Sequence, residues 1–449
     1  MPGPRRPLSP PRILAIGMAG VIAAGTLILV LPMSATGGRS IGLLTAFFTS
    51  TSAVCVTGLI TADTPVAFSG FGQAVILLLI QVGGLGYMAL STLVAIALGR
   101  KVGLHARFSL QESLNLSSRR DLIHFTATVF KLTLAFELLG AAVLTWRWWG
   151  QYDLATAAWQ GLFHAVSAFN NAGFSLFSTS LVGSRGDVVV TLTVCTLVVC
   201  GGIGYLVLAE LARYRRERML SLHSRLVLTV TAALITFGTL AIFLLERHNQ
   251  ATLGGLPASE AWLAAFFQSV TTRTAGFNTV DIGALTPATL FLMMILMFIG
   301  ASPGGTGGGV KVSTFSVTVL ALWATIRGYR EPSVFWRRLP PDLVARAFFV
   351  SLTAFLALNA VAGALLVTEA GDLLRTLFEA TSAFGTVGLS TGLTGAPVSL
   401  VGGYSTAGQL LICALMFAGR VGPLTIAFAL AGRTLVSRVS YPEGRVLIG

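Results

Sequence analysis

The chain has 449 residues, of which 54% are hydrophobic and 10% are charged, and its mean hydropathy is +0.81. Because an ordinary soluble domain carries about 25% charged residues, the composition excludes a soluble globule. At about 20 apolar residues for each bilayer crossing, the length allows roughly eight spans with their loops and no sizeable soluble domain. The net charge of +13 comes from basic residues that cluster between the apolar runs. This placement indicates membrane topology and not a nucleic-acid partner.

Eight apolar stretches are candidates for membrane helices. They cover residues 13–33, 73–98, 125–144, 191–211, 226–245, 290–326, 347–367 and 407–432. Within each successive pair lies a shorter, half-apolar segment: 41–52, 154–168, 261–270 and 373–383. Because these segments are too short to cross the bilayer, we expect each to enter and leave on one side.

The four short segments resemble one another. They end in SAVCVTGL, SAFNNAGF, VTTRTAGF and SAFGTVGL, which align on Gly58, Gly173, Gly276 and Gly388. A second glycine-rich element follows each of them, at residues 83–87, 201–205, 304–309 and 419–423. The pattern predicts an all-α integral membrane protein in which a re-entrant pore loop (P) lies between two spanning helices (M1 and M2). Four such M1-P-M2 repeats, eight transmembrane helices in all, would surround a central pore.

The predicted repeats are residues 1–110, 111–218, 219–340 and 341–449, with a broken M2 helix and a gating loop in the third and the C-terminal tail in the fourth. Basic residues concentrate at the N-terminus, in the loops between repeats and in the tail. By the positive-inside rule both termini are cytoplasmic, and the pore loops open outward. The outer connections are comparatively acidic, which would concentrate cations at the entrance. Their acidic residues are Asp63, Asp153, Asp187, Glu246, Asp281, Glu369 and Asp372.

Non-helical backbone at membrane depth is tolerated only where it is buried in protein or lines a watery path. A ring of backbone carbonyls can replace the hydration shell of a monovalent cation, and glycine accepts the dihedral angles that this requires. One such motif alone would indicate a tight turn, but four copies in register favour an ion filter. The predicted K⁺-binding residues are Val56, Thr57 and Gly58; Asn171, Ala172 and Gly173; Thr274, Ala275 and Gly276; and Thr386, Val387 and Gly388.

The motifs VTGL, NNAGF, TRTAGFN and FGTVGLS, in this order, resemble the superfamily of potassium transport subunits that includes TrkH, KtrB and plant HKT proteins. The resemblance covers nearly the whole chain and, with eight spans, is closer to KtrB. It implies passive K⁺ uptake, often stimulated by Na⁺, by a homodimer in the cell inner (plasma) membrane with one pore per subunit. It also implies gating by a cytosolic, KtrA-like ring of nucleotide-binding RCK subunits, and no covalent cofactor. Gly58 implies K⁺ selectivity, because members with serine at this place tend to admit Na⁺ alone.

The sixth apolar stretch is interrupted by FIGASPGGTGGGVKVSTF at residues 298–315. Proline and six glycines are incompatible with a straight helix here. A plain linker is the simpler explanation, but linkers do not lie between apolar segments at mid-membrane depth. We favour a plug under the filter, similar to the intramembrane gate of the family, and no strand precedes the glycines as a phosphate-binding loop would need. The predicted gate residues are Gly304, Gly305, Thr306, Gly307, Gly308, Gly309 and Lys311, together with Arg420.

Six charged residues within the membrane segments need separate interpretations. By resemblance, Arg420 lines the cytoplasmic side of the pore and raises the barrier for cations; the alternative is a structural arginine at a helix kink. Lys311 is either a gating charge or a side chain that reaches the cytosolic interface. Arg273 is expected to support the filter from behind, with Glu379 as its hypothetical partner. Lys131 and Glu137 receive no function.

A coupled Na⁺ or H⁺ symporter is the main alternative, because broken helices also mark such transporters. It would usually show twofold repeats and a carboxylate in the path. An enzyme is not expected, since the five histidines are scattered, and a structural scaffold would leave the four motifs unexplained. The basic cytosolic loops suit a partner with an acidic surface, although anionic lipid would account for them as well.

Overall fold

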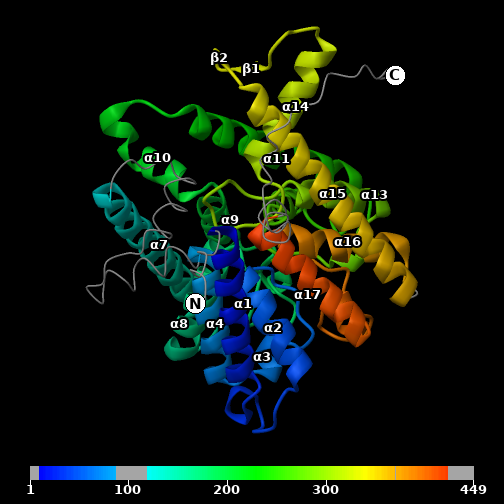
Figure 1. Ribbon diagram of the computed structural model, residues 1–449. Coiled ribbons are helices and arrows are strands. Elements are labelled where there is room, and N and C mark those ends of the chain that lie inside the picture. Colours follow the sequence, from blue (N-terminus) through cyan, green and yellow to red (C-terminus); the bar gives the residue numbers. More distant parts are fainter. Residues whose placement is uncertain (1–9, 87–118, 370, 423–449) are drawn as a thin grey trace, which may run out of the picture.

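The computed structural model describes residues 10–86, 119–369 and 371–422 (Figure 1). The N-terminal basic segment, the loop expected between the first two repeats and the C-terminal tail lie largely outside these residues. The described part is helical, apart from a hairpin of the strands β1 (Ser333–Val334) and β2 (Arg337–Arg338).

Twelve of the described helices form four units of three helices each. The units are called first to fourth in chain order. Each unit begins with a long helix: α1 (Pro10–Leu29), α7 (Arg119–Trp148), α11 (Leu222–Glu246) and α15 (Pro341–Glu369). A short helix follows: α2 (Leu43–Cys55), α8 (Leu154–Phe169), α12 (Ala258–Thr271) and α16 (Leu373–Gly385). The third helices are α4 (Gly70–Leu85), α9 (Val188–Gly202), α13 (Pro287–Phe298) and α17 (Thr406–Val421). Further elements are α3 (Thr64–Ala67), α10 (Tyr205–Glu217), α14 (Val312–Ile326) and the 3-10 turns η1 (Pro32–Ser34), η2 (Val182–Ser184), η3 (Ile282–Ala284) and η4 (Leu400–Gly403).

Within the described residues, three helical segments are long and apolar enough to cross a bilayer: 126–148, 222–246 and 341–369. The pair α9 and α10, bent by 104°, could count as a fourth span. The other apolar helical segments, among them residues 15–29 of α1, have 10–17 residues, so the eight-span arrangement stays a prediction.

The units pack in a closed cycle. The third helix of each unit contacts the short helix of the next: α4 packs on α8, α9 on α12, and α13 on α16. The cycle closes because α17 packs on α2, which brings the first and last units side by side (Figure 1). The short helices therefore lie at the centre, each held between two units.

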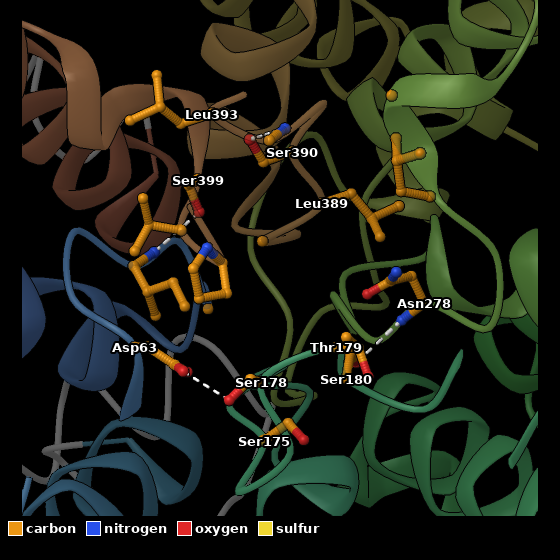
Figure 2. A pocket seen from close by; sticks show the side chains of 18 of the residues that line it. Asp63, Ser175, Ser178, Thr179, Ser180, Asn278, Leu389, Ser390, Leu393 and Ser399 are labelled. Atoms are coloured by element: carbon orange, nitrogen blue, oxygen red, sulfur yellow. Dashed lines mark hydrogen bonds between the residues drawn. The ribbon is translucent and has the colours of Figure 1, made fainter. Parts of the chain in front are cut away.

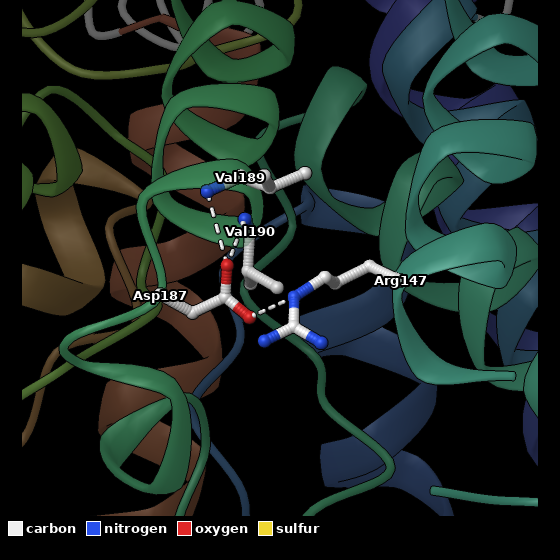
Figure 3. A network of polar contacts seen from close by, with 4 residues as sticks. All are labelled: Arg147, Asp187, Val189 and Val190. Carbon is white, nitrogen blue, oxygen red and sulfur yellow. Dashed lines mark hydrogen bonds and ion pairs between the residues drawn. The ribbon is translucent and has the colours of Figure 1, made fainter. Parts of the chain in front are cut away.

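Polar caps fix where the third helices begin. The side chains of Ser69, Thr286 and Ser405 each accept a hydrogen bond from the first turn of their helix, which satisfies a backbone donor that the helix leaves unpaired. Asp187 does the same for α9 and also forms an ion pair with Arg147 of α7, with 2.6 Å between the Nε and Oδ2 atoms (Figure 3). This ion pair fixes α7, the first helix of the second unit, against α9, the third helix of the same unit.

Glycines allow the third helices to approach the short helices closely. A Cβ atom at Gly83, Gly201 or Gly419 would overlap a backbone carbonyl oxygen at the end of the short helix in the same unit. Only a residue without a side chain permits this contact. In the third unit the arrangement differs, because α13 ends at Phe298 and the chain runs without helix to Lys311 before α14 begins.

Candidate functional site

The four predicted filter glycines lie together and form a ring. A Cβ added to Gly58 would lie 3.1 Å from the Cα of Gly173, and one added to Gly173 would lie 2.9 Å from the Cα of Gly276. The corresponding distances are 3.3 Å from Gly276 to Gly388 and 3.0 Å from Gly388 back to Gly58. Each added Cβ would also collide with the carbonyl oxygen of the residue before the next glycine. The four segments thus approach one another as closely as backbone can.

The backbone of all four segments has the same alternation. The glycines have φ between +69° and +95°, and the residues two places earlier also have positive φ: 57° at Val56, 59° at Asn171, 75° at Thr274 and 49° at Thr386. The intervening Thr57, Ala172, Ala275 and Val387 do not. Positive φ at a non-glycine residue costs about 1–3 kcal/mol and persists only where surrounding structure enforces it. Left-handed residues at alternate places turn successive carbonyls toward the same side.

In three of the four segments, the hydroxyl of a residue in the last turn of the short helix helps to hold this conformation. The carbonyl of Ser52 accepts the Thr57 N–H at 2.8 Å, while its Oγ accepts the Gly58 N–H at 3.0 Å. The hydroxyls of Ser167 and Thr271 donate to the carbonyls that follow their glycines, at 2.8 and 2.6 Å. Our sequence analysis gave these residues no role, although a serine or threonine begins or follows the start of each aligned motif.

Outside the glycine ring lies a cavity of about 630 Å³ lined by residues from all four units (Figure 2). Hydrogen bonds join the outer loops around it. Ser178 donates to Asp63 at 2.6 Å, Asn278 donates its N–H to Ser180 at 3.3 Å, and Ile60 exchanges two 3.0 Å hydrogen bonds with Ser399. The glycines Gly58, Gly173, Gly276 and Gly388 form part of its wall, so the cavity is a vestibule on one side of the ring.

The interrupted segment between α13 and α14 lies against the other side of the ring. The Gly308 N–H donates to Thr386 Oγ1 at 2.9 Å, and a Cβ at Gly307 would overlap the Thr274 hydroxyl. The segment is also tied to the glycine-rich elements of other units: Thr306 N–H donates to Gly201 O at 3.1 Å and Gly309 N–H to Gly419 O at 3.2 Å. The residues predicted as a plug therefore contact the filter segments directly.

Both predicted gate cations contact this segment. The Arg420 guanidinium donates to the carbonyl oxygens of Thr306 and Gly83, and Lys311 Nζ donates to Gly307 O at 2.5 Å. With Gly305, they line a second cavity of about 170 Å³. Two basic side chains thus bind the interrupted segment that lies against the ring.

The predicted pairing of Arg273 with Glu379 is wrong. Arg273 donates to Gly300 O at 3.2 Å, at the start of the interrupted segment, whereas Glu379 accepts the Val401 N–H at 3.0 Å. No ion pair joins them in the part of the chain that the structure describes. Arg273 lies just after the end of α12, whereas Glu379 lies in the middle of α16. The two side chains therefore start from different heights along the short helices and do not meet.

A triangle of buried polar side chains was not predicted from the sequence. Glu137 of α7 binds Asn170, the residue before the second filter segment, at 2.8 Å, and Gln81 of α4 binds both. Glu137 lies 33 residues before Asn170 in the chain, and its only sequence signal was an acidic residue inside an apolar stretch.

Comparison with known proteins supports this architecture. The family model described as "TrkH: Cation transport protein" matches residues 21–433. The chain belongs to the TrkH family. Family membership makes it a membrane transport protein and not an enzyme.

Within the TrkH family, the chain is 40% identical over 441 residues to the Ktr system potassium uptake protein B of Bacillus subtilis, covering 98% of this chain and 97% of that protein. It is 34% identical over 451 residues to the potassium/sodium uptake protein NtpJ of Enterococcus hirae, covering 99% and 98%. The crystal structure of the potassium transporter TrkH from Vibrio parahaemolyticus matches with a TM-score of 0.73 at 18% identity, over 96% of this chain and 86% of that one. This last likeness shows the fold alone.

Proposed function

We propose that this chain is the ion-translocating subunit of a potassium uptake system and conducts K⁺ passively through the glycine ring. The observation that carries the proposal is the closed ring of four segments with one backbone alternation. The names of the relatives, potassium uptake proteins matched over nearly their full length, support K⁺ as the ion.

In this proposal K⁺ enters the outer vestibule, where Asp63 and Asp281 are part of the lining. Carbonyl oxygens from the three-residue segments ending at Gly58, Gly173, Gly276 and Gly388 then replace its water shell. Because the oxygens belong to the backbone and their positions are enforced by hydrogen bonds to the short helices, a smaller ion such as Na⁺ is bound less well.

The segment 304–309 with Lys311 and Arg420 is the proposed gate. Its contacts with Thr274 and Thr386 support a closed pore, and the two cations oppose the passage of K⁺. Opening would require the segment to leave Thr386, Gly201 and Gly419, a change that breaks a few hydrogen bonds and no large apolar core.

The remaining features are proposals that rest on family membership. We infer eight spans in four M1-P-M2 repeats with the boundaries 1–110, 111–218, 219–340 and 341–449, an inner-membrane location, and cytoplasmic termini. We also infer a homodimer, gated by a cytosolic nucleotide-binding RCK ring and stimulated by Na⁺. The word "system" in the relatives' names supports a partner subunit, and the arginines around the β1–β2 hairpin offer a basic cytosolic surface.

A coupled symporter remains the second candidate because the name of one relative includes sodium. Against it, the charged residues lining the cavity beneath the ring are Lys311 and Arg420, both basic. A carboxylate that binds a coupling ion is therefore missing from the described lining of that cavity.

The test is Rb⁺ uptake into liposomes that contain the purified protein, driven only by a K⁺ diffusion potential. Passive conduction predicts uptake without any Na⁺ or H⁺ gradient, and loss of concentrative uptake when equal K⁺ concentrations on both sides of the membrane abolish the potential. Uptake that occurs only under an imposed Na⁺ or H⁺ gradient would contradict the proposal and establish the symporter.

A further inference from the structure

The side chains of Glu137, Asn170 and Gln81 form a closed triangle at the end of the second short helix. Glu137 Oε1 accepts from Asn170 Nδ2 at 2.8 Å, and Glu137 Oε2 accepts from Gln81 Nε2 at 3.2 Å. The third side is completed by Asn170 Nδ2, which donates to Gln81 Oε1 at 2.9 Å. Each residue comes from a different helix, so the triangle joins the first unit to the second.

The carboxylate of Glu137 is buried, with 3% of the residue exposed. Among the described residues no cationic side chain forms an ion pair with it, and its hydrogen bonds come from two neutral amides. Burying an acidic group inside a membrane protein costs free energy, and such a residue is therefore a candidate for a functional role. A purely structural link between these helices would need only amides or hydroxyls.

Asn170 transmits the contact to the filter. It ends α8, and the next residue, Asn171, is the first filter residue with positive φ, 59°. Gly84 of α4 leaves room for it, because a Cβ there would overlap the Asn170 side chain. The Asn171 side-chain amide then lies 2.9 Å from Thr274 Oγ1 in the third filter segment. A displacement of Asn170 would therefore move two of the four segments.

The equivalent place in the other units is occupied differently. Three residues before the filter glycine stand Cys55, Arg273 and Gly385. Cys55 is buried in the apolar core, Arg273 binds a backbone carbonyl, and Gly385 has no side chain. Among the described residues, only the second unit has a residue at this place, Asn170, that is bound by a carboxylate. The side chains that hold the four filter segments therefore differ from unit to unit.

We infer that Glu137 is a positioning residue that determines the ion selectivity of the ring by fixing Asn170 and the carbonyls that follow it. This inference rests on the proposed filter function. Because the carboxylate offers two acceptors, it can orient Asn170 and Gln81 together. A glutamine in its place has one acceptor oxygen and turns an N–H₂ donor toward the other amide.

The experiment compares Na⁺ with Rb⁺ flux in liposomes for the native chain, Glu137→Gln, Glu137→Leu and Gln81→Met. We expect the Na⁺/Rb⁺ flux ratio to rise at least about tenfold in Glu137→Leu, and by a smaller factor in Glu137→Gln, which keeps one acceptor, and in Gln81→Met. The matched control is Gln73→Leu. Gln73 also joins α4 to α8, through a 2.9 Å hydrogen bond from Trp159, but it contacts no filter residue, so its flux ratio should remain native.

Thermal melts of each purified variant separate positioning from stability. A folded Glu137→Leu variant with lower melting temperature and native flux ratio would overturn the inference, and so would an equal shift in Gln73→Leu. If Glu137→Leu does not fold, Glu137→Gln and Gln81→Met decide the matter: a raised ratio supports the inference and a native ratio overturns it. If the native chain shows no preference for Rb⁺, the proposed filter fails, and the inference fails with it.

Discussion

Gly388 lies directly against Gly58: a Cβ added to Gly388 would be 3.0 Å from the Cα of Gly58 and would overlap the carbonyl oxygen of Thr57. The two glycines belong to the last and first units of the chain. Their contact closes the ring, and substitutions there test whether the close approach or the backbone conformation is what transport requires.

Gly388→Ala should abolish K⁺ or Rb⁺ uptake in liposomes. It adds a methyl group at a residue with φ of +89°, which costs about 1–2 kcal/mol for any L-residue, and it pushes Thr57 out of the ring. Gly395→Ala is the control, since Gly395 has φ of +81° but nothing within 4 Å of the added Cβ. It should transport normally; equal loss in both variants would mean that strain and not ring contact is responsible.

Arg420→Gln should raise K⁺ leak through the protein in the absence of any partner. The substitution removes a positive charge beneath the ring and weakens the contacts with Thr306 and Gly83. Lowering the barrier by about 1.4 kcal/mol would raise flux roughly tenfold. Arg420→Lys keeps the charge but loses the two-pronged contact, so it should leak less than Arg420→Gln. Flux at or below the native level in both variants would argue against a gate at this residue.

Thr386→Val should also increase basal flux, because it removes the hydroxyl that accepts the Gly308 N–H while keeping the branched shape of the side chain. Thr386→Ser keeps the acceptor and should behave as the native chain does. Stopped-flow measurement of K⁺ efflux from liposomes resolves the difference. Identical efflux in the two variants would show that this hydrogen bond does not hold the gate closed.

Two outer carboxyl groups should give opposite pH dependences of stability. Burial raises the pKa of Asp63 above its ordinary 3.8, with the hydrogen bond from Ser178 opposing the shift. Its ionised form is therefore penalised in the folded protein, so its contribution to stability is present below pH 3.8 and is lost as pH rises through the raised pKa. Asp63→Asn should be at least as stable as the native chain at pH about 7, and its relative advantage should shrink in acid.

Asp153 provides the control of opposite sign. Hydrogen bonds from Thr156 at the start of α8 lower the pKa of this carboxyl, so its contribution is present above its ordinary pKa and is lost as pH falls through the lowered one. Asp153→Asn should therefore melt at a lower temperature than the native chain at pH about 7. Thermal melts in detergent at several pH values measure both effects, and a destabilised Asp63→Asn at neutral pH would contradict the assignment.

The close approach of the four glycines and the interruption of the sixth apolar stretch could be predicted from the sequence, because the first leaves a repeated pattern and the second a local one. The aligned motifs placed Gly58, Gly173, Gly276 and Gly388 in equivalent positions, and Pro303 with its neighbouring glycines marked the interruption of the sixth stretch. Residues at equivalent positions of a repeat share a structural role. Four repeats arranged around one axis bring such residues, here the four glycines, into contact.

The contacts of Arg273, Glu379 and Glu137 could not be predicted in the same way. Each contact depends on which neighbouring unit the side chain faces and on its position along the helix. The repeated motif does not specify either of these. Arg273 and Glu379 looked like a pair because their charges are opposite, but each binds a backbone group instead of the other side chain. Glu137 binds residues 33 and 56 positions away in the chain, a separation for which no pattern in one sequence gives a signal.

The central claim, that the glycine ring selects K⁺, is tested most directly by Gly58→Ser in liposomes under an imposed gradient of K⁺, Rb⁺ or Na⁺. The new Cβ would overlap the Ala172 carbonyl oxygen at a residue with φ of +95°. Gly37→Ser is the control, with φ of +89° and open space around the Cβ. The account predicts selective K⁺ and Rb⁺ flux in the native chain and in Gly37→Ser, and Na⁺ flux in Gly58→Ser. Unchanged selectivity in Gly58→Ser, with flux retained, would contradict it.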